Sequence, residues 1–264
     1  MPLDEMTMTP NYIFQLSRVE LYWLVGSFGI TNILILDEAW RGRSIRDYEA
    51  DLQEGNASLT TRGLIRPSPG FGWQVDRLPA AIVQWMATAN SMLRVEHIEK
   101  NSVKSNLHIF TSGEQALSIE IENDIAHFVL YKTRTAMKKT LQKWLNIPAK
   151  SGKSKDTFSI PQPQTFIPVA WKDPKLAAQI LKNNDPSANS KTLIEWAASL
   201  KCLVVFSKVQ INSEAGGASA QFTLCMDGKS LWGGGVDHQE TANHFAMFST
   251  MTLKELDAKI NEMA

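Results

Sequence analysis

The sequence predicts an α+β fold of two halves related by a pseudo-twofold axis, each with helices and an antiparallel sheet. Apolar residues recur about every 3.6 positions in some segments, as in an amphipathic helix, and at every second position in others, as in a half-buried strand. The strand-like segments are short and separated by short turns, which favours antiparallel pairing. The order of helices, four strands and a closing helix then occurs twice along the chain.

The first half begins with a predicted strand over 13–16 that runs into a helix starting at Ser17. Ser17 and Glu20 have the spacing of a capping box, in which each side chain satisfies a backbone N–H of the other residue. A second predicted helix follows, and we expect Gly55 and Asn56 to break it, because glycine is unfavourable inside a helix.

A third helix is predicted over 80–92, after a turn rich in proline and glycine. The apolar period then changes from about 3.6 to about 2, which predicts four strands. These strands lie at 93–97, 107–111, 117–121 and 125–131. Their short connections predict an antiparallel meander, and a helix that follows Thr135 closes the half.

The second half is predicted to repeat this order. Residues 146–164 are rich in Pro, Lys and Ser and are interpreted as a linker or surface loop. The predicted domains are therefore 1–148 and 149–264, joined into one globular unit. A short strand is predicted over 166–171, and Asp173-Pro174 has the pattern of a helix start. A helix, four strands and a last helix are then predicted at 190–196, 202–209, 221–226, 230–235, 244–248 and 252–263.

The composition excludes several classes of protein. Hydrophobic residues make up 44% of the 264 residues, which is enough for a core without disulfides. Lys and Arg total 27, as do Asp and Glu, and this neutral balance argues against a dedicated nucleic-acid binder. Cys202 and Cys225 are too few for a disulfide framework and fit a reducing compartment. Residues 1–5 do not resemble a signal peptide, and the most apolar stretch, 22–36, is too short to span a bilayer. We therefore expect a cytoplasmic protein.

No arrangement typical of catalysis is present in the sequence. One cluster has metal-ligand residue types, Asp237, His238, Glu240 and His244, but its spacing fits no common zinc motif and favours a polar turn. His97, His108 and His127 fall on three predicted strands, where single histidines usually serve packing and hydrogen bonding. The two cysteines are expected to be small buried residues on neighbouring strands. We therefore expect no enzymatic activity, cofactor or metal site.

One segment favours a different function. Residues 59–65, a glycine-containing turn and residues 73–75 are similar to the end of a recognition helix and a wing, as in winged-helix DNA-binding proteins. Five arginines are candidates for phosphate contacts: Arg41, Arg43, Arg46, Arg62 and Arg66. The alternative function is thus a winged-helix transcriptional regulator with a C-terminal sensing or dimerisation region. In such a regulator this segment forms a compact basic module of its own.

The whole order of elements resembles the EspG family of ESX, or type VII, secretion-associated chaperones. The resemblance covers nearly the full chain and is carried by five short motifs. They are Ile13–Leu16 with Val19–Leu21, Leu59–Leu64 (LTTRGL), Met92–Glu96, Ala126–Val129 and Trp144–Ala149. In this family the Arg-Gly-Leu segment is expected to pack into the body that bears the sheet.

The resemblance implies a non-enzymatic chaperone, a monomer or weak dimer that contacts neither membrane nor nucleic acid. Its implied partner is a helical secreted client, a PE–PPE-like pair or another helical hairpin, which it keeps soluble before export. The connection between the second and third strands of the meander is implied to bind the client. Here it consists of Glu99, Lys100, Asn101, Ser102, Val103, Lys104 and Ser105. Val103, flanked by lysines, suits an apolar tip with a polar rim, although an ordinary solvated turn fits these residues equally well.

Overall fold

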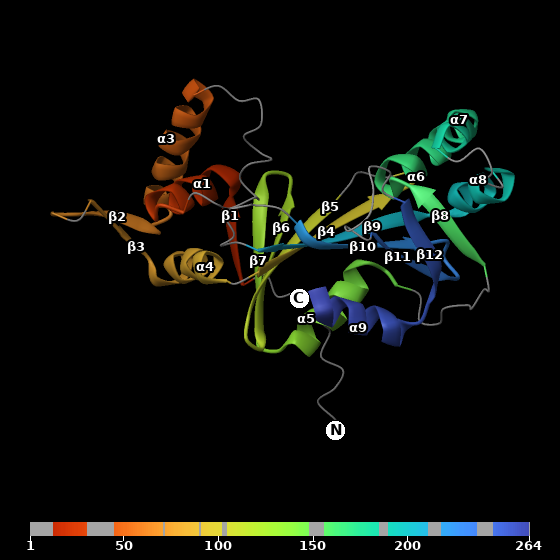
Figure 1. Cartoon of the computed structure of the whole chain (residues 1–264). Helices are drawn as coiled ribbons and strands as arrows, with labels where there is room; N and C mark the ends of the chain where they lie inside the picture. Colours follow the sequence, from red (N-terminus) through yellow and green to blue (C-terminus); the bar gives the residue numbers. More distant parts are fainter. Residues whose placement is uncertain are drawn as a thin grey trace. The chain divides into compact units, whose positions relative to one another are not determined.

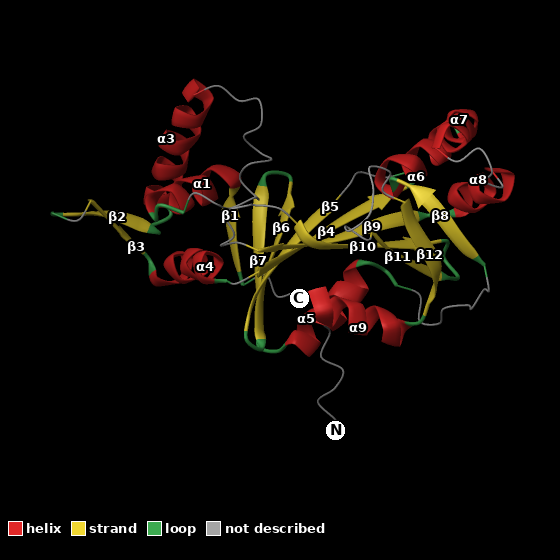
Figure 2. Cartoon of the chain, in the orientation of Figure 1, coloured by secondary structure: helices red, strands yellow, loops and turns green. Residues whose placement is uncertain are grey.

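A computed structural model, drawn in Figures 1 and 2, describes most of the chain. The described residues are 13–30, 45–70, 72–89, 91–101, 105–147, 156–184, 190–210, 218–236 and 245–263. They form helices and antiparallel strands, which confirms the predicted α+β class.

The chain divides into two compact units, each of which is made of three separate stretches of the sequence. The first unit comprises Met1–Met92, Leu107–Met137 and Gln210–Gly217, and the second comprises Leu93–Asn106, Lys138–Val209 and Ala218–Ala264. The predicted cut between residues 148 and 149 separates the two sequence halves, whereas the units assign 93–106 and 138–148 to the second body.

The first unit carries strands in the order β1-β7-β6-β5, with a separate β2–β3 hairpin. Its elements are β1 (Phe14–Ser17), α1 (Arg18–Ser27), α3 (Ile45–Thr61), β2 (Ile65–Ser68), β3 (Gly72–Val75), α4 (Arg77–Thr88), β5 (Ser105–Ser112), β6 (Gln115–Glu122) and β7 (Ile125–Tyr131). The β6–β7 turn consists of Asn123 and Asp124, with φ values of 49° and 64°. Two residues with positive φ give the turn a twist that matches the flanking strands, and Asn and Asp tolerate this backbone well.

The second unit carries strands in the order β4-β9-β10-β11-β12-β8. Its elements are β4 (Ser91–Glu99), α5 (Arg134–Trp144, which begins in the first unit), β8 (Thr157–Pro161), α6 (Pro163–Lys172), α7 (Pro174–Asn184), α8 (Ser190–Ser199), β9 (Cys202–Gln210), β10 (Ala218–Met226), β11 (Leu231–Val236), β12 (Phe245–Met251) and α9 (Leu253–Met263). Figure 2 shows α6, α7 and α8 on one side of strands β8 to β12 and α9 on the other.

An aromatic cluster anchors α8 on the strands of the second unit. The ring of Trp196 stacks on Phe158 of β8 at 4.6 Å between centroids, and it meets Trp232 of β11 edge-on at 5.5 Å. Phe248 of β12 lies 5.7 Å from the same Trp196 ring. Such pairs stabilise by about 1 kcal/mol each beyond the burial of their area, so this cluster fixes the helical layer on the sheet.

The predicted duplication is present in the chain topology. Apart from the β2–β3 hairpin, which only the first half has, a first strand in each half precedes three described helices, and four strands and a closing helix follow. The first strand then pairs antiparallel with the last of the four. Thus β1 pairs with β7, with Phe14 opposite Phe128, and β8 pairs with β12, with Phe158 opposite Phe248.

Two predictions about the start of the second half are wrong. Residues 157–161, interpreted as part of a linker, form β8, and residues 166–171, predicted as a strand, belong to α6. Phe166, Ile167 and Ala170 are all buried, a spacing that fits one face of a helix. A short continuous apolar run does not distinguish a buried strand from a buried helix, which explains the error.

The predicted break at Gly55 and Asn56 is also wrong, because α3 runs without interruption from Ile45 to Thr61. Gly55 lies where α3 meets the backbone of α1. A Cβ atom at this position would lie 2.3 Å from the carbonyl oxygen of Val19. The missing side chain lets the two helices approach closely, and this packing outweighs the low helix propensity of glycine.

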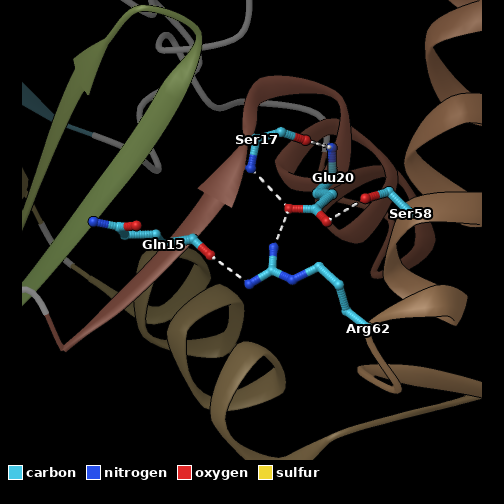
Figure 3. Close-up of polar contacts among 5 residues, drawn as sticks. All are labelled: Gln15, Ser17, Glu20, Ser58 and Arg62. Atoms are coloured by element: carbon cyan, nitrogen blue, oxygen red, sulfur yellow. Dashed lines mark hydrogen bonds and ion pairs between the residues drawn. The ribbon is translucent and has the colours of Figure 1, made fainter.

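A buried carboxylate joins β1, α1 and α3 (Figure 3). Glu20 is 1% exposed, and its carboxylate accepts hydrogen bonds from the backbone N–H of Ser17 and the hydroxyl of Ser58, both at 2.7 Å. The guanidinium of Arg62 lies 2.5 Å from the same carboxylate. Burial alone would raise the pKa of Glu20. The hydrogen bonds from Ser58, Ser17 and Arg62, with the positive charge of Arg62, outweigh burial and hold the pKa below its ordinary value of 4.5.

Arg62 places the Arg-Gly-Leu segment against the strand-bearing body of the first unit. A second N–H of its guanidinium donates to the backbone carbonyl of Gln15 in β1 at 3.0 Å, and the guanidinium lies 5.9 Å from the Phe14 ring centroid. This packing is what the family resemblance predicts. Of the other candidate arginines, Arg46 and Arg66 are exposed, and Arg41 and Arg43 lie outside the described residues.

Candidate partner-binding site

The predicted partner-binding residues extend along the sequence from the end of β4 to the start of β5. Glu99 is the last residue of β4 and Ser105 is the first residue of β5. Lys100 and Asn101 form an exposed turn after β4. The other three predicted residues lie outside the described residues: Ser102, Val103 and Lys104.

The start of this connection is held by backbone hydrogen bonds. The N–H of Lys100 donates to the carbonyl of Lys201 at 2.9 Å, and the N–H of Lys201 donates to the carbonyl of Met226 at 2.7 Å. The ammonium group of Lys100 also donates to the carbonyl of Ala198 at the end of α8, at 2.7 Å. The connection therefore leaves the second unit from a fixed position.

A cavity of about 590 Å³ adjoins this fixed start. Besides His97, three buried side chains line it: Leu145, which follows α5, Cys202 at the start of β9, and Met226 at the end of β10. Glu99, Lys100 and Asn101 line it too, so part of the predicted site and the cavity form one surface. Sequence reasoning missed the cavity because its residues are far apart in the chain.

His97 is a buried titratable side chain that also lines this cavity. Its side chain is 9% exposed, and its Nε2 lies 3.7 Å from a carboxylate oxygen of Glu99. The imidazole packs on Trp144 of α5, with 5.5 Å between ring centroids. Burial lowers the pKa of His97 more than the nearby Glu99 raises it, so the ring is neutral at pH 7.

The fold that carries this site has a solved counterpart. The sequence matches no protein-family profile and no curated protein. The structure is similar to that of the Mycobacterium tuberculosis type VII secretion system chaperone EspG5, solved in complex with a PE25–PPE41 dimer. The TM-score is 0.60 at 9% sequence identity, and the match covers 95% of each chain.

The chain has an EspG-like fold. At this low identity the similarity concerns the fold, and it extends over both halves of the chain rather than over one. The predicted fold class is therefore confirmed, including the repeated α+β order on which the family resemblance was based.

The two thiols of this EspG-like chain are structural. Both are free and buried, Cys202 on β9 and Cys225 on β10, as the sequence predicts. Cys202 pairs with Met226 and Cys225 with Leu203, so the thiols project from opposite faces of the sheet. Burial, with a smaller effect of the Glu99 charge, raises the pKa of Cys202 to about 12, and burial raises that of Cys225 well above its usual value. Both thiols are therefore protonated and weakly nucleophilic at pH 7.

The structure does not bring His108 and His127 together. His127 of β7 is opposite Glu120 of β6, and Glu120 is opposite Leu107 of β5. His108 follows Leu107 in the same strand, so its side chain projects from the other face of the sheet. His127 instead shares a hydrogen bond with the side-chain amide of Gln15.

The candidate metal cluster of Asp237, His238, Glu240 and His244 lies outside the described residues. Within the described ranges, no three His, Cys, Asp or Glu side chains gather closely enough to hold a metal ion. None of the described helices is both long and apolar enough to cross a bilayer.

Proposed function

We propose that this protein is a non-enzymatic cytoplasmic chaperone that binds a helical-hairpin substrate of a type VII (ESX-like) secretion system and keeps it soluble before export. The observation that supports the proposal is the likeness to a chaperone structure over 95% of both chains. That chaperone is bound to a PE25–PPE41 dimer, which suggests a helical client here as well. The client is a PE–PPE-like pair or another long helical hairpin.

The proposed contact is the connection of residues 99–105. Its start is anchored through Lys100 on Lys201, just before β9, and on Ala198 of α8, which lowers the entropy lost when a partner binds. Val103 is its apolar residue, with Lys100 and Lys104 on either side. An apolar anchor surrounded by polar residues is the usual composition of a binding hot spot.

The client is identified by capture from the cytosol of the source organism with the tagged full-length protein, followed by nuclease treatment and mass spectrometry. We expect a helical, secreted-type protein in near-equal amount. If instead the protein recovers promoter DNA alone in a parallel sample without nuclease, the winged-helix regulator is the better function. The contacts of Arg62 with Glu20 and Gln15 favour the chaperone over the regulator, because they occupy a side chain that a regulator would direct to phosphate.

Replacing Val103 with Asp tests the proposed contact. We expect client recovery to fall about tenfold, because a charge at an apolar anchor removes one hot-spot contact. The melting temperature should barely change, since substitutions in surface loops rarely alter stability by more than ~0.5 kcal/mol. Met247→Asp is the matched control, because Met247 is an apolar side chain on β12 that is 66% exposed. A large loss of stability in Val103→Asp, or equal client recovery by both variants, would contradict the assignment.

A further inference from the structure

The cavity beside the β4–β5 connection has an apolar floor. Leu145, Cys202 and Met226 are each at most 6% exposed and line it. The Cys202 thiol is uncharged at pH 7, as argued above, so it behaves as a small hydrophobic group. A short hydrocarbon chain that enters the cavity would therefore contact an apolar surface.

The mouth of the cavity carries more positive than negative charge. Lys100 and Lys201 line it together with one acidic residue, Glu99, whose side chain is 51% exposed. Within the described part of the chain, the ammonium group of Lys201 has no hydrogen-bond or ion-pair partner. A Cβ atom on Gly228 would lie 2.7 Å from that ammonium nitrogen, so the absence of a side chain at Gly228 leaves room for Lys201.

The wall of the cavity contributes an unsatisfied buried nitrogen. The Nε2 atom of His97 is buried and has no hydrogen-bond partner among the described residues. Its distance of 3.7 Å to Glu99 is too long for a hydrogen bond. A buried polar atom without a partner is costly. A ligand oxygen that enters the cavity would satisfy Nε2, when this atom carries the proton, once the side chains that cover it move aside.

We propose that this cavity is a carboxylate-binding subsite. The carboxylate accepts a hydrogen bond from Lys201, and a second from His97 once the cover over its Nε2 moves aside, and its hydrocarbon stem contacts the floor. The inference rests on the proposed function for the source of this group, which is an acidic side chain of the bound client. The cavity shares Glu99, Lys100 and Asn101 with the connection proposed to contact that client, so one partner reaches both.

The subsite is tested without the client by titrating hexanoate into the isotope-labelled full-length protein and recording its NMR spectrum. We expect the amide signals of residues 97–101 and 226–228 to shift. Hexanamide, which has the same length and no charge, should bind to the unchanged protein at least about fivefold more weakly than hexanoate. Hexanoate should bind to the Lys201→Gln variant more weakly by a similar factor. Each change removes one charge-assisted contact. Lys182→Gln, at an exposed lysine of α7, should leave hexanoate binding unchanged. The proposal would be overturned if hexanoate and hexanamide bound equally well, or if Lys201→Gln bound hexanoate as well as the unchanged protein does. It would also be overturned if the amide signals of these residues did not shift.

The source of the carboxylate is tested by client capture with Lys201→Glu. We expect this variant to recover less client than Lys201→Gln, because it places a negative charge beside an acidic side chain. If hexanoate binds as expected but Lys201→Glu recovers the client fully, the client is not the source and a free organic acid is the ligand. If the unchanged protein captures no client at all, the proposed function fails, while the hexanoate titration still decides the subsite.

Discussion

Replacing Gly55 with Ala is expected to destabilise the protein by about 3 kcal/mol, the upper range for overpacking a tight contact. In an exposed helix the same substitution stabilises by about 1 kcal/mol, because alanine has the higher helix propensity. Here the new Cβ would lie 2.3 Å from the carbonyl oxygen and 2.8 Å from the carbonyl carbon of Val19. These are backbone atoms of α1, so α3 must move as a whole. The measurement is urea-induced unfolding followed by tryptophan fluorescence and circular dichroism.

Gly26→Ala in α1 is the matched control. Among the described residues, a Cβ atom at Gly26 would meet only the hydroxyl of Tyr48, at 3.9 Å, which is an ordinary contact distance. This variant should be as stable as the unchanged protein or more stable, by up to about 1 kcal/mol. If Gly55→Ala were equally stable, the close approach of α1 and α3 would be incorrect.

Replacing Arg62 with Met is expected to lower the free energy of unfolding by about 2 kcal/mol at pH 7. Loss of one partner of a buried ion pair usually costs more, but the Arg62 side chain is 41% exposed and water screens part of the interaction. The substitution leaves the nearly inaccessible Glu20 carboxylate with only its bonds to Ser17 and Ser58. Arg66→Met, at an exposed position in the same segment, should change stability by less than about 0.5 kcal/mol.

The effect of Arg62→Met should depend on pH. The pKa of Glu20 is lower in the folded protein than its ordinary value of 4.5, so its charged form stabilises the fold above that pH. This contribution is lost as the pH falls through the pKa of the folded state. The stability difference between the unchanged protein and Arg62→Met should therefore be largest near neutral pH and shrink in acid. A difference that is independent of pH would mean that Arg62 acts through packing alone.

Features that depend on neighbouring residues were predictable from the sequence. The capping boxes Ser17–Glu20 and Thr252–Glu255 both form, because their hydrogen bonds connect residues three positions apart. The Asn123-Asp124 turn, the two meanders and the repeated order follow from turn residues and apolar periods. These local signals carry most of the fold.

Features that depend on distant residues were not predictable. The capping box predicted a role for Glu20 at the helix start. The contact of Glu20 with Arg62 was not predictable, because it joins residues 42 positions apart. Gly55 was interpreted as a helix breaker because its neighbour across the helix interface is invisible in one sequence. The cavity likewise combines β4, the end of α5 and the β9–β10 pair, so only the tertiary structure reveals it. The role of Val103 stays a prediction, since it lies outside the described residues.

The hydrogen bond from Arg62 to the carbonyl of Gln15 also bears on how the chain avoids associating with copies of itself. Among the described strands of the first unit, β1 is the outermost, with a strand partner, β7, on one side. An outermost strand exposes backbone groups that another chain can extend into a larger sheet. The guanidinium occupies one such acceptor and places a positive charge along that margin. Arg62 therefore does more than neutralise a buried acid, because it also occupies a backbone acceptor at the edge where another strand could pair.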